Sequence, residues 1–177
     1  IIDTDSHQME PASIWTEFID PTFADQAPRM GDYANGGRGM MVEGEPITKQ
    51  DGSYPMDAEE FLDATVQAMK RFGRTREAGF SNVARIQDMD DQGVDAQVLY
   101  PTVGGQILGK PFKNPELLAA VCRAYNDWSL EYCSLSPMRL RMAAMLPMQA
   151  PDLAIEEARR AVSKGAAAFY LRPNPVS

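Results

Sequence analysis

Short apolar segments of strand type alternate with helical segments along this chain. The expected strands are one that opens at Ile1 and three at residues 95–100, 140–146 and 166–171. The expected helices lie at residues 12–20, 57–72, 82–92, 114–136 and 152–164. This order implies right-handed crossovers and a parallel sheet covered by helices. The sequence therefore predicts an α/β fold.

Local signals mark the ends of several of these helices. Asn114 and Pro115 suit the N-cap and the first helical position of one helix. Gly93 and Gly165 suit the position just after a helix, where a left-handed backbone conformation is needed. Residues 29–55 are rich in Gly, Asp, Asn and Pro, and we expect an irregular loop or a hairpin inserted there after the first strand.

Two architectures satisfy the predicted order, an open doubly wound sheet and half of an eight-stranded barrel. The open sheet usually binds phosphates at a Gly-rich first turn, whereas the first turn here is acidic. Gly104 and Gly105 follow the second strand without the spacing of a phosphate-binding motif, so we expect them in a flexible loop. Both architectures place functional residues at the carboxyl ends of the strands.

Length and charge exclude several classes of function. A chain of 177 residues fits one domain, residues 1–177. A net charge of −8 and a pI near 4.7 argue against nucleic acids and anionic membrane surfaces as partners. No apolar run approaches the roughly 18 residues of a spanning helix, and we expect a cytoplasmic protein. Cys122 and Cys133 lie on one expected helix about 16 Å apart, too far to form a disulfide.

Polar side chains gather where the expected strands end. Alternation along the first strand predicts that Asp3, Asp5 and His7 project to one side, with Glu10 following across a turn. Carboxylate and imidazole together suit zinc or manganese. On spacing alone, ordinary turn chemistry and a structural histidine explain these residues as well. The other strand ends deliver Tyr100, Thr102, Pro147, Gln149, Tyr170, Arg172 and Asn174.

Five segments occur together in an order that is typical of a known family. They are residues 1–11 (IIDTDSHQMEP), 90–102 (DDQGVDAQVLYPT), 125–128 (YNDW), 137–140 (PMRL) and 171–174 (LRPN). In these segments the chain resembles the N-terminal half of the amidohydrolase-2 group of the amidohydrolase superfamily, which includes aminocarboxymuconate-semialdehyde decarboxylase and related aromatic-acid decarboxylases and hydrolases.

The resemblance implies the first half of a (β/α)8 TIM barrel, with about four βα units. It also implies a divalent metal, or a pair, at the C-terminal face of the barrel. Asp5 and His7 fall on the two ligand positions of the first strand, and Glu10 is a weaker candidate. Zinc is the metal expected first, with manganese and iron as alternatives.

The chain departs from the family in the remaining ligands of the metal site. Family members add one or two histidines from the fifth and sixth strands and an aspartate from the eighth, whereas this sequence has four expected strands and one histidine. The chain is therefore a segment of a longer polypeptide, which we favour, or one of two half-barrels that associate, or catalytically dead.

The resemblance implies a metal-dependent hydrolase or a non-oxidative decarboxylase that acts on a small carboxylate- or carbonyl-bearing molecule. Arg172 is expected to pair with a substrate carboxylate, or else to be an ordinary exposed arginine. Tyr100 and Asn174 are further candidates for substrate binding. The alternative is a non-enzymatic half-barrel that acts as a scaffold and covers its open sheet edges with a partner.

Overall fold

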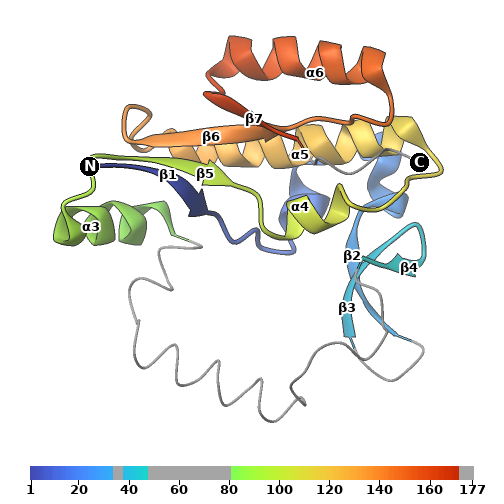
Figure 1. Cartoon of the computed structure of the whole chain (residues 1–177). Coiled ribbons are helices and arrows are strands. Elements are labelled where there is room, and N and C mark those ends of the chain that lie inside the picture. The colour runs from blue at the N-terminus through green and yellow to red at the C-terminus, as the bar shows by residue number, and fades with distance from the viewer. Residues whose placement is uncertain (34–37, 48–80, 172–177) are drawn as a thin grey trace.

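Four parallel strands in chain order form the centre of the molecule (Figure 1). The computed structural model of the protein describes residues 1–33, 38–47 and 81–171. The strands are β1 (Ile2–His7), β5 (Ala96–Tyr100), β6 (Leu140–Met145) and β7 (Ala168–Tyr170), and each is parallel to its neighbours. A doubly wound sheet reverses its strand order, and this sheet does not. The fold is therefore a half-barrel, as the sequence predicts.

The helices between the strands begin and end on local signals. They are α3 (Asn82–Gln92), α5 (Pro115–Cys133) and α6 (Pro151–Lys164). The Asn114 side chain accepts hydrogen bonds from two main-chain N–H groups of the first turn of α5, as an N-cap should. Gly93 and Gly165 follow α3 and α6 with φ values of 69° and 110°, which confirms their predicted role. Helix α5 ends at Cys133, earlier than residue 136.

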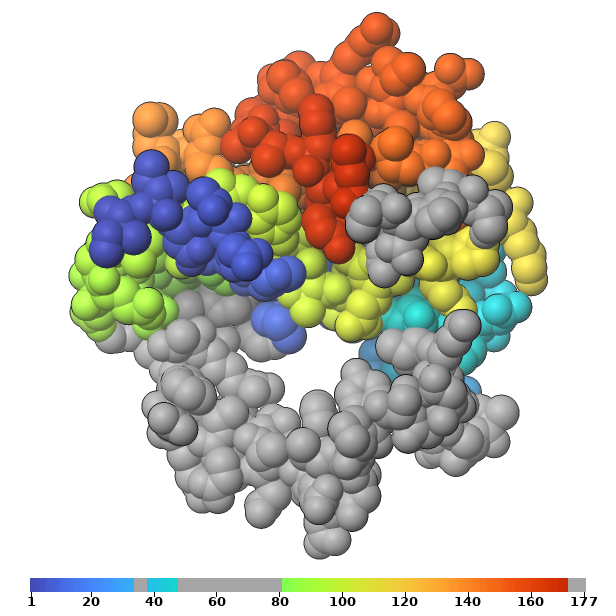
Figure 2. Space-filling view, in the orientation of Figure 1, coloured from blue at the N-terminus to red at the C-terminus, as the bar shows by residue number. Residues whose placement is uncertain are grey.

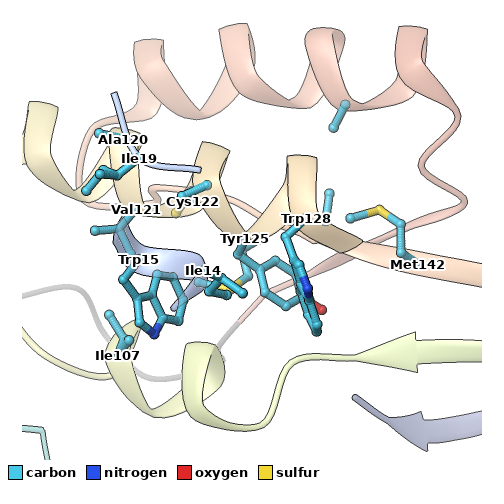
Figure 3. Packing of buried hydrophobic residues seen from close by; sticks show 14 of the residues in the cluster. Ile14, Trp15, Ile19, Ile107, Ala120, Val121, Cys122, Tyr125, Trp128 and Met142 are labelled. Atoms are coloured by element: carbon cyan, nitrogen blue, oxygen red, sulfur yellow. The ribbon is translucent and has the colours of Figure 1, made fainter. Parts of the chain in front are cut away.

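The core lies between α5 and the strands. Leu117, Val121 and Tyr125 of α5 are fully buried, and Trp15 of the short helix α1 (Ile14–Glu17) packs against them (Figure 3). Cys122 and Cys133 are buried and unbridged, as the sequence predicts. Burial raises the pKa of the Cys133 thiol to about 12, so this group stays protonated at neutral pH.

The insertion after β1 folds back onto the start of α5. A 3₁₀ helix (Pro21–Gln26) leads into three antiparallel strands, β2 (Arg29–Asp32), β3 (Arg38–Val42) and β4 (Glu45–Pro46). At the turn between β3 and β4, the Glu43 carboxylate accepts hydrogen bonds from the N–H groups of Lys113 and Asn114. A hairpin is therefore present in the predicted place. The helix predicted at residues 57–72 lies outside the described residues.

Two expectations about local structure are wrong. Gly104 and Gly105 do not lie in a flexible loop, because they belong to a short helix, α4 (Val103–Ile107), and both are buried. Val83, Ile86 and Met89 share one apolar stripe of the helix expected at residues 82–92, which predicts a buried Val83, but its side chain is 53 % exposed. None of the helices in the described ranges is long and apolar enough to cross a membrane.

A single buried amide joins α5 to the last residue of β6. The Asn126 side chain donates to the Met145 carbonyl oxygen at 3.0 Å and accepts from the Met145 N–H at 2.8 Å. Its Nδ2 also donates to the buried Glu157 carboxylate of α6 at 2.7 Å. The amide thus pairs with Met145 as a neighbouring strand would. Asn126 therefore has a structural hydrogen-bonding role.

We expect Asn126→Ala to lower the free energy of unfolding by about 2–4 kcal/mol, because it leaves the Met145 peptide groups and Glu157 without this partner in a buried site. Urea denaturation measures the loss. Asn114→Ala is the matched control, since removal of a half-buried N-cap amide costs about 1 kcal/mol. Equal losses for the two variants would contradict the special role of Asn126.

Candidate metal centre

A β-bulge in β1 determines which of its side chains share a face. Asp3 pairs with Gln97, and Ser6 pairs with Leu99. Between these two pairs, β1 contains one more residue than β5 does. The Ser6 hydroxyl donates to the Asp3 carboxylate, on the face where Leu99 is buried. Asp3 therefore does not share the face of His7, and the prediction that Asp3, Asp5 and His7 project to one side is wrong. Simple alternation fails because the bulge shifts its phase.

Asp5 and His7 remain at the exposed end of β1. Both are exposed, and the buried Ser6 lies between them, as alternation after the bulge requires. In Figure 2 the N-terminal residues (blue) and β7 (red) are visible on one face of the molecule. The Asp5 carboxylate accepts no hydrogen bond from any residue that the structure describes. Among these described residues, no donor competes with a cation for its oxygens.

The His7 ring is oriented through one of its two nitrogens. Nδ1 lies 3.2 Å from the Pro101 carbonyl oxygen and 3.3 Å from the Thr102 hydroxyl oxygen. A carbonyl oxygen only accepts, so Nδ1 carries the hydrogen in this bond. The neutral ring then offers the lone pair of Nε2. Metal-binding histidines usually have this arrangement, in which a carbonyl or carboxylate fixes the other nitrogen.

Glu10 binds the main chain that follows β5. Its carboxylate accepts hydrogen bonds from the N–H groups of Thr102 at 2.9 Å, Val103 at 3.0 Å and Gly104 at 3.0 Å. These groups form the start of α4, so Glu10 caps this helix. Burial raises the pKa of Glu10, while the same hydrogen bonds act to lower it. A metal role for Glu10 stays a prediction, and capping is the role that its contacts show.

The two glycines of α4 let this helix approach the strand ends closely. A Cβ atom on Gly104 would lie 2.6 Å from the Met145 sulfur and 3.1 Å from Glu10 Oε1. A Cβ atom on Gly105 would lie 3.0 Å from the Tyr170 hydroxyl oxygen. All three distances are shorter than ordinary carbon contacts. Close packing therefore explains why glycine occupies these two positions, and the flexibility that we expected does not.

Aromatic rings adjoin His7 on the same side. The centroid of the Tyr100 ring lies 6.2 Å from that of His7 and 6.2 Å from that of Tyr170. The structure thus brings together His7 and the predicted substrate-binding residue Tyr100, and adds Tyr170. Arg172 and Asn174, the other two predicted residues, lie outside the described residues. Their roles stay predictions.

Known proteins agree with this architecture. The sequence model of a family described as amidohydrolase matches residues 2–176. The chain belongs to the amidohydrolase family. A comparison of this amidohydrolase with curated proteins finds no match.

One solved structure shows the same fold, and two others are similar to a lesser degree. An amidohydrolase from Mycobacterium avium subsp. paratuberculosis K-10 is similar with a TM-score of 0.72 and 21 % identity, over 99 % of this chain and 50 % of that one. A 2,6-dihydroxybenzoate decarboxylase from Rhizobium has a TM-score of 0.49 and 17 % identity, over 95 % of this chain and 36 % of that one. A dihydroxybenzoic acid decarboxylase from Polaromonas sp. JS666, with bound manganese and 2-nitroresorcinol, has a TM-score of 0.49 and 16 % identity, over 95 % and 36 %. The amidohydrolase chain spans about half the length of the first of these.

Within the described part of this amidohydrolase, no three His, Cys, Asp or Glu side chains gather as a metal-binding group. A catalytic zinc normally has three protein ligands. Asp5 and His7 supply an oxygen and a nitrogen donor of the types that zinc, manganese and iron accept. The residues present therefore fit part of a metal centre.

We expect Glu10→Gln to lower the free energy of unfolding by about 1–3 kcal/mol, because an amide has one acceptor oxygen where the capping bonds use both carboxylate oxygens. Thermal or urea unfolding measures this loss. Glu17→Gln, on the exposed part of α1, is the control and should change stability by less than about 0.5 kcal/mol. Stability unchanged in Glu10→Gln would contradict the capping role.

Proposed function

We propose that this amidohydrolase is a metal-dependent hydrolase or non-oxidative decarboxylase that acts on a small carboxylate- or carbonyl-bearing molecule. The observation that carries the proposal is the orientation of His7. Its Nδ1 is held by the Pro101 carbonyl at the carboxyl end of β1, the end at which barrel enzymes place their active sites. Nε2 is then the metal-binding nitrogen, and Asp5 supplies the oxygen ligand beside it.

Zinc is the proposed metal, with manganese and iron as alternatives. Such a metal, when bound, polarises a substrate oxygen and lowers the pKa of a bound water. Because the described part of the chain offers two ligands, the remaining ligands are proposed to come from further residues of a longer chain or from a second copy. A cytoplasmic location stays a prediction.

The protein's own groups are proposed to position the substrate. Tyr100 and Tyr170 form the wall next to His7, and each presents a ring and a hydroxyl. Arg172 lies two residues after the end of β7 in the sequence and is proposed to bind a substrate carboxylate through two parallel N–H donors. Asn174 is proposed as a further hydrogen-bonding group for the substrate.

Metal analysis of the purified full-length protein tests the proposal. We expect about one zinc, manganese or iron per chain in the wild type, and loss of most of it in His7→Ala and Asp5→Asn, because each variant removes a ligand. Turnover should fall at least about 100-fold in both variants, since second-shell changes alone cost 10–100-fold. Asp152→Asn, an exposed carboxylate in the first turn of α6, is the matched control and should keep its metal.

A wild-type protein that neither contains nor takes up any of these metals would overturn the proposal and would favour the scaffold alternative. The reaction type is decided by the product. Release of carbon dioxide from a carboxylate substrate identifies a decarboxylase, and uptake of solvent oxygen into the product identifies a hydrolase.

A further inference from the structure

A buried arginine of α3 contacts the main chain of β1 at His7. Arg85 is 6 % exposed, and its Nη2 donates to the His7 carbonyl oxygen at 2.6 Å. Its Nε donates to the Tyr132 hydroxyl at 2.9 Å and its Nη1 to Gln97 Oε1 at 3.0 Å. We propose that Arg85 is a positioning residue that fixes β1 at His7 and so aims the imidazole. This inference rests on the proposed function.

The partners of Arg85 are unusual for a buried charge. All three hydrogen bonds go to neutral groups, namely a phenol, an amide and a main-chain carbonyl. Burial of a guanidinium without a carboxylate in direct contact is unfavourable, and an apolar side chain of similar volume is often as stable in such a place. Stability alone therefore gives a poor account of Arg85. Its rigid fork of donors suits the fixing of three acceptors in one geometry.

Arg85 holds both sides of the bulge in β1. It contacts His7, after the bulge, directly. It contacts Asp3, before the bulge, through Gln97, whose Nε2 lies 3.5 Å from Asp3 Oδ2. The bulge is the feature that sends Asp5 and His7 to a different face from Asp3. A loss of Arg85 would therefore loosen the register on which the direction of the two proposed ligands depends.

The His7 side chain is held independently by the chain that follows β5. Its Nδ1 bonds to the Pro101 carbonyl, and the neighbouring Gln8 N–H donates to the Tyr100 carbonyl at 3.0 Å. Arg85 acts on the main chain of the same residue from α3. A shift of that main chain would lengthen the Nδ1 bond to Pro101, and so change which ring nitrogen carries the hydrogen. This gives a readout that needs no metal.

Arg85→Met tests the inference, because methionine keeps much of the volume and removes the donors. The probe is zinc alone, and its dissociation constant is measured by competition with a chelator in the full-length protein. We expect zinc binding to weaken by about 10–100-fold, the usual effect of a lost outer-shell contact. Arg85→Lys keeps the positive charge but lacks the forked N–H donors of the guanidinium, and it should recover part of the affinity. Arg160→Met is the matched control, since Arg160 is part-buried but bonds to Glu157 and Asp127 between α5 and α6.

The second readout is the nitrogen NMR spectrum of the His7 ring in the metal-free protein. The His7 signal is assigned by its loss in His7→Ala. Wild type and Arg160→Met should show hydrogen on Nδ1, and Arg85→Met a mixture of the two forms. Gln97→Leu serves as the variant if Arg85→Met does not fold, and the same changes are expected in smaller degree.

Two outcomes overturn the inference. One is zinc affinity within about twofold of wild type together with an unchanged ring spectrum. The other is an equal loss of affinity in Arg160→Met, which would show a general effect of stability. If the wild type binds no zinc, manganese or iron, the proposed function fails by itself, and the ring spectrum alone then decides the role of Arg85.

Discussion

The extra residue in β1 is the constraint on which the candidate site depends. A regular strand would place Asp3, Asp5 and His7 on one side, and the bulge instead separates Asp3 from the other two. One face then carries the Asp3, Ser6 and Gln97 contacts beneath the helices, and the other carries the ring of His7 next to Tyr100. A bulge beside an active site commonly redirects a side chain in this way. The structural contacts of β1 and its candidate ligands are thus separated by one inserted residue.

Much of the fold could be predicted from the sequence because its signals are local. Asn114 and Pro115 mark the start of α5, and Gly93 and Gly165 mark the ends of two helices, within one turn of the residues they affect. Apolar runs identify the strands to within one or two residues. The order of strands and helices limits the topology to two choices, and the observed strand order decides between them.

The parts that could not be predicted depend on partners far away in the chain. Glu10 reads as a free carboxylate in the sequence, but it caps a helix that begins 93 positions later. Gly104 and Gly105 read as a flexible loop, because nothing near them in sequence shows that Met145 and Tyr170 lie against them. Nothing near Arg85 in the sequence shows that its side chain bonds to Tyr132, Gln97 and His7. Composition and periodicity do not show such contacts. Residue type could therefore suggest candidate ligands, whereas the geometry around them could not be predicted.

The ends of β1 and β5 act as one unit as a result of these long-range contacts. His7 bonds to Pro101 through its ring, the Thr102 hydroxyl donates to the Gln8 carbonyl, and the Glu10 carboxylate binds the next main-chain groups. Each bond alone contributes about 1 kcal/mol, but together they leave the loops after both strands little freedom relative to each other. Binding sites on such fixed strand ends lose less entropy when a ligand binds than sites on free loops. The polar residues that look like candidate ligands in the sequence therefore fall into two groups. Asp5 and His7 are exposed candidate ligands, whereas Glu10 and similar residues fix the main chain around them.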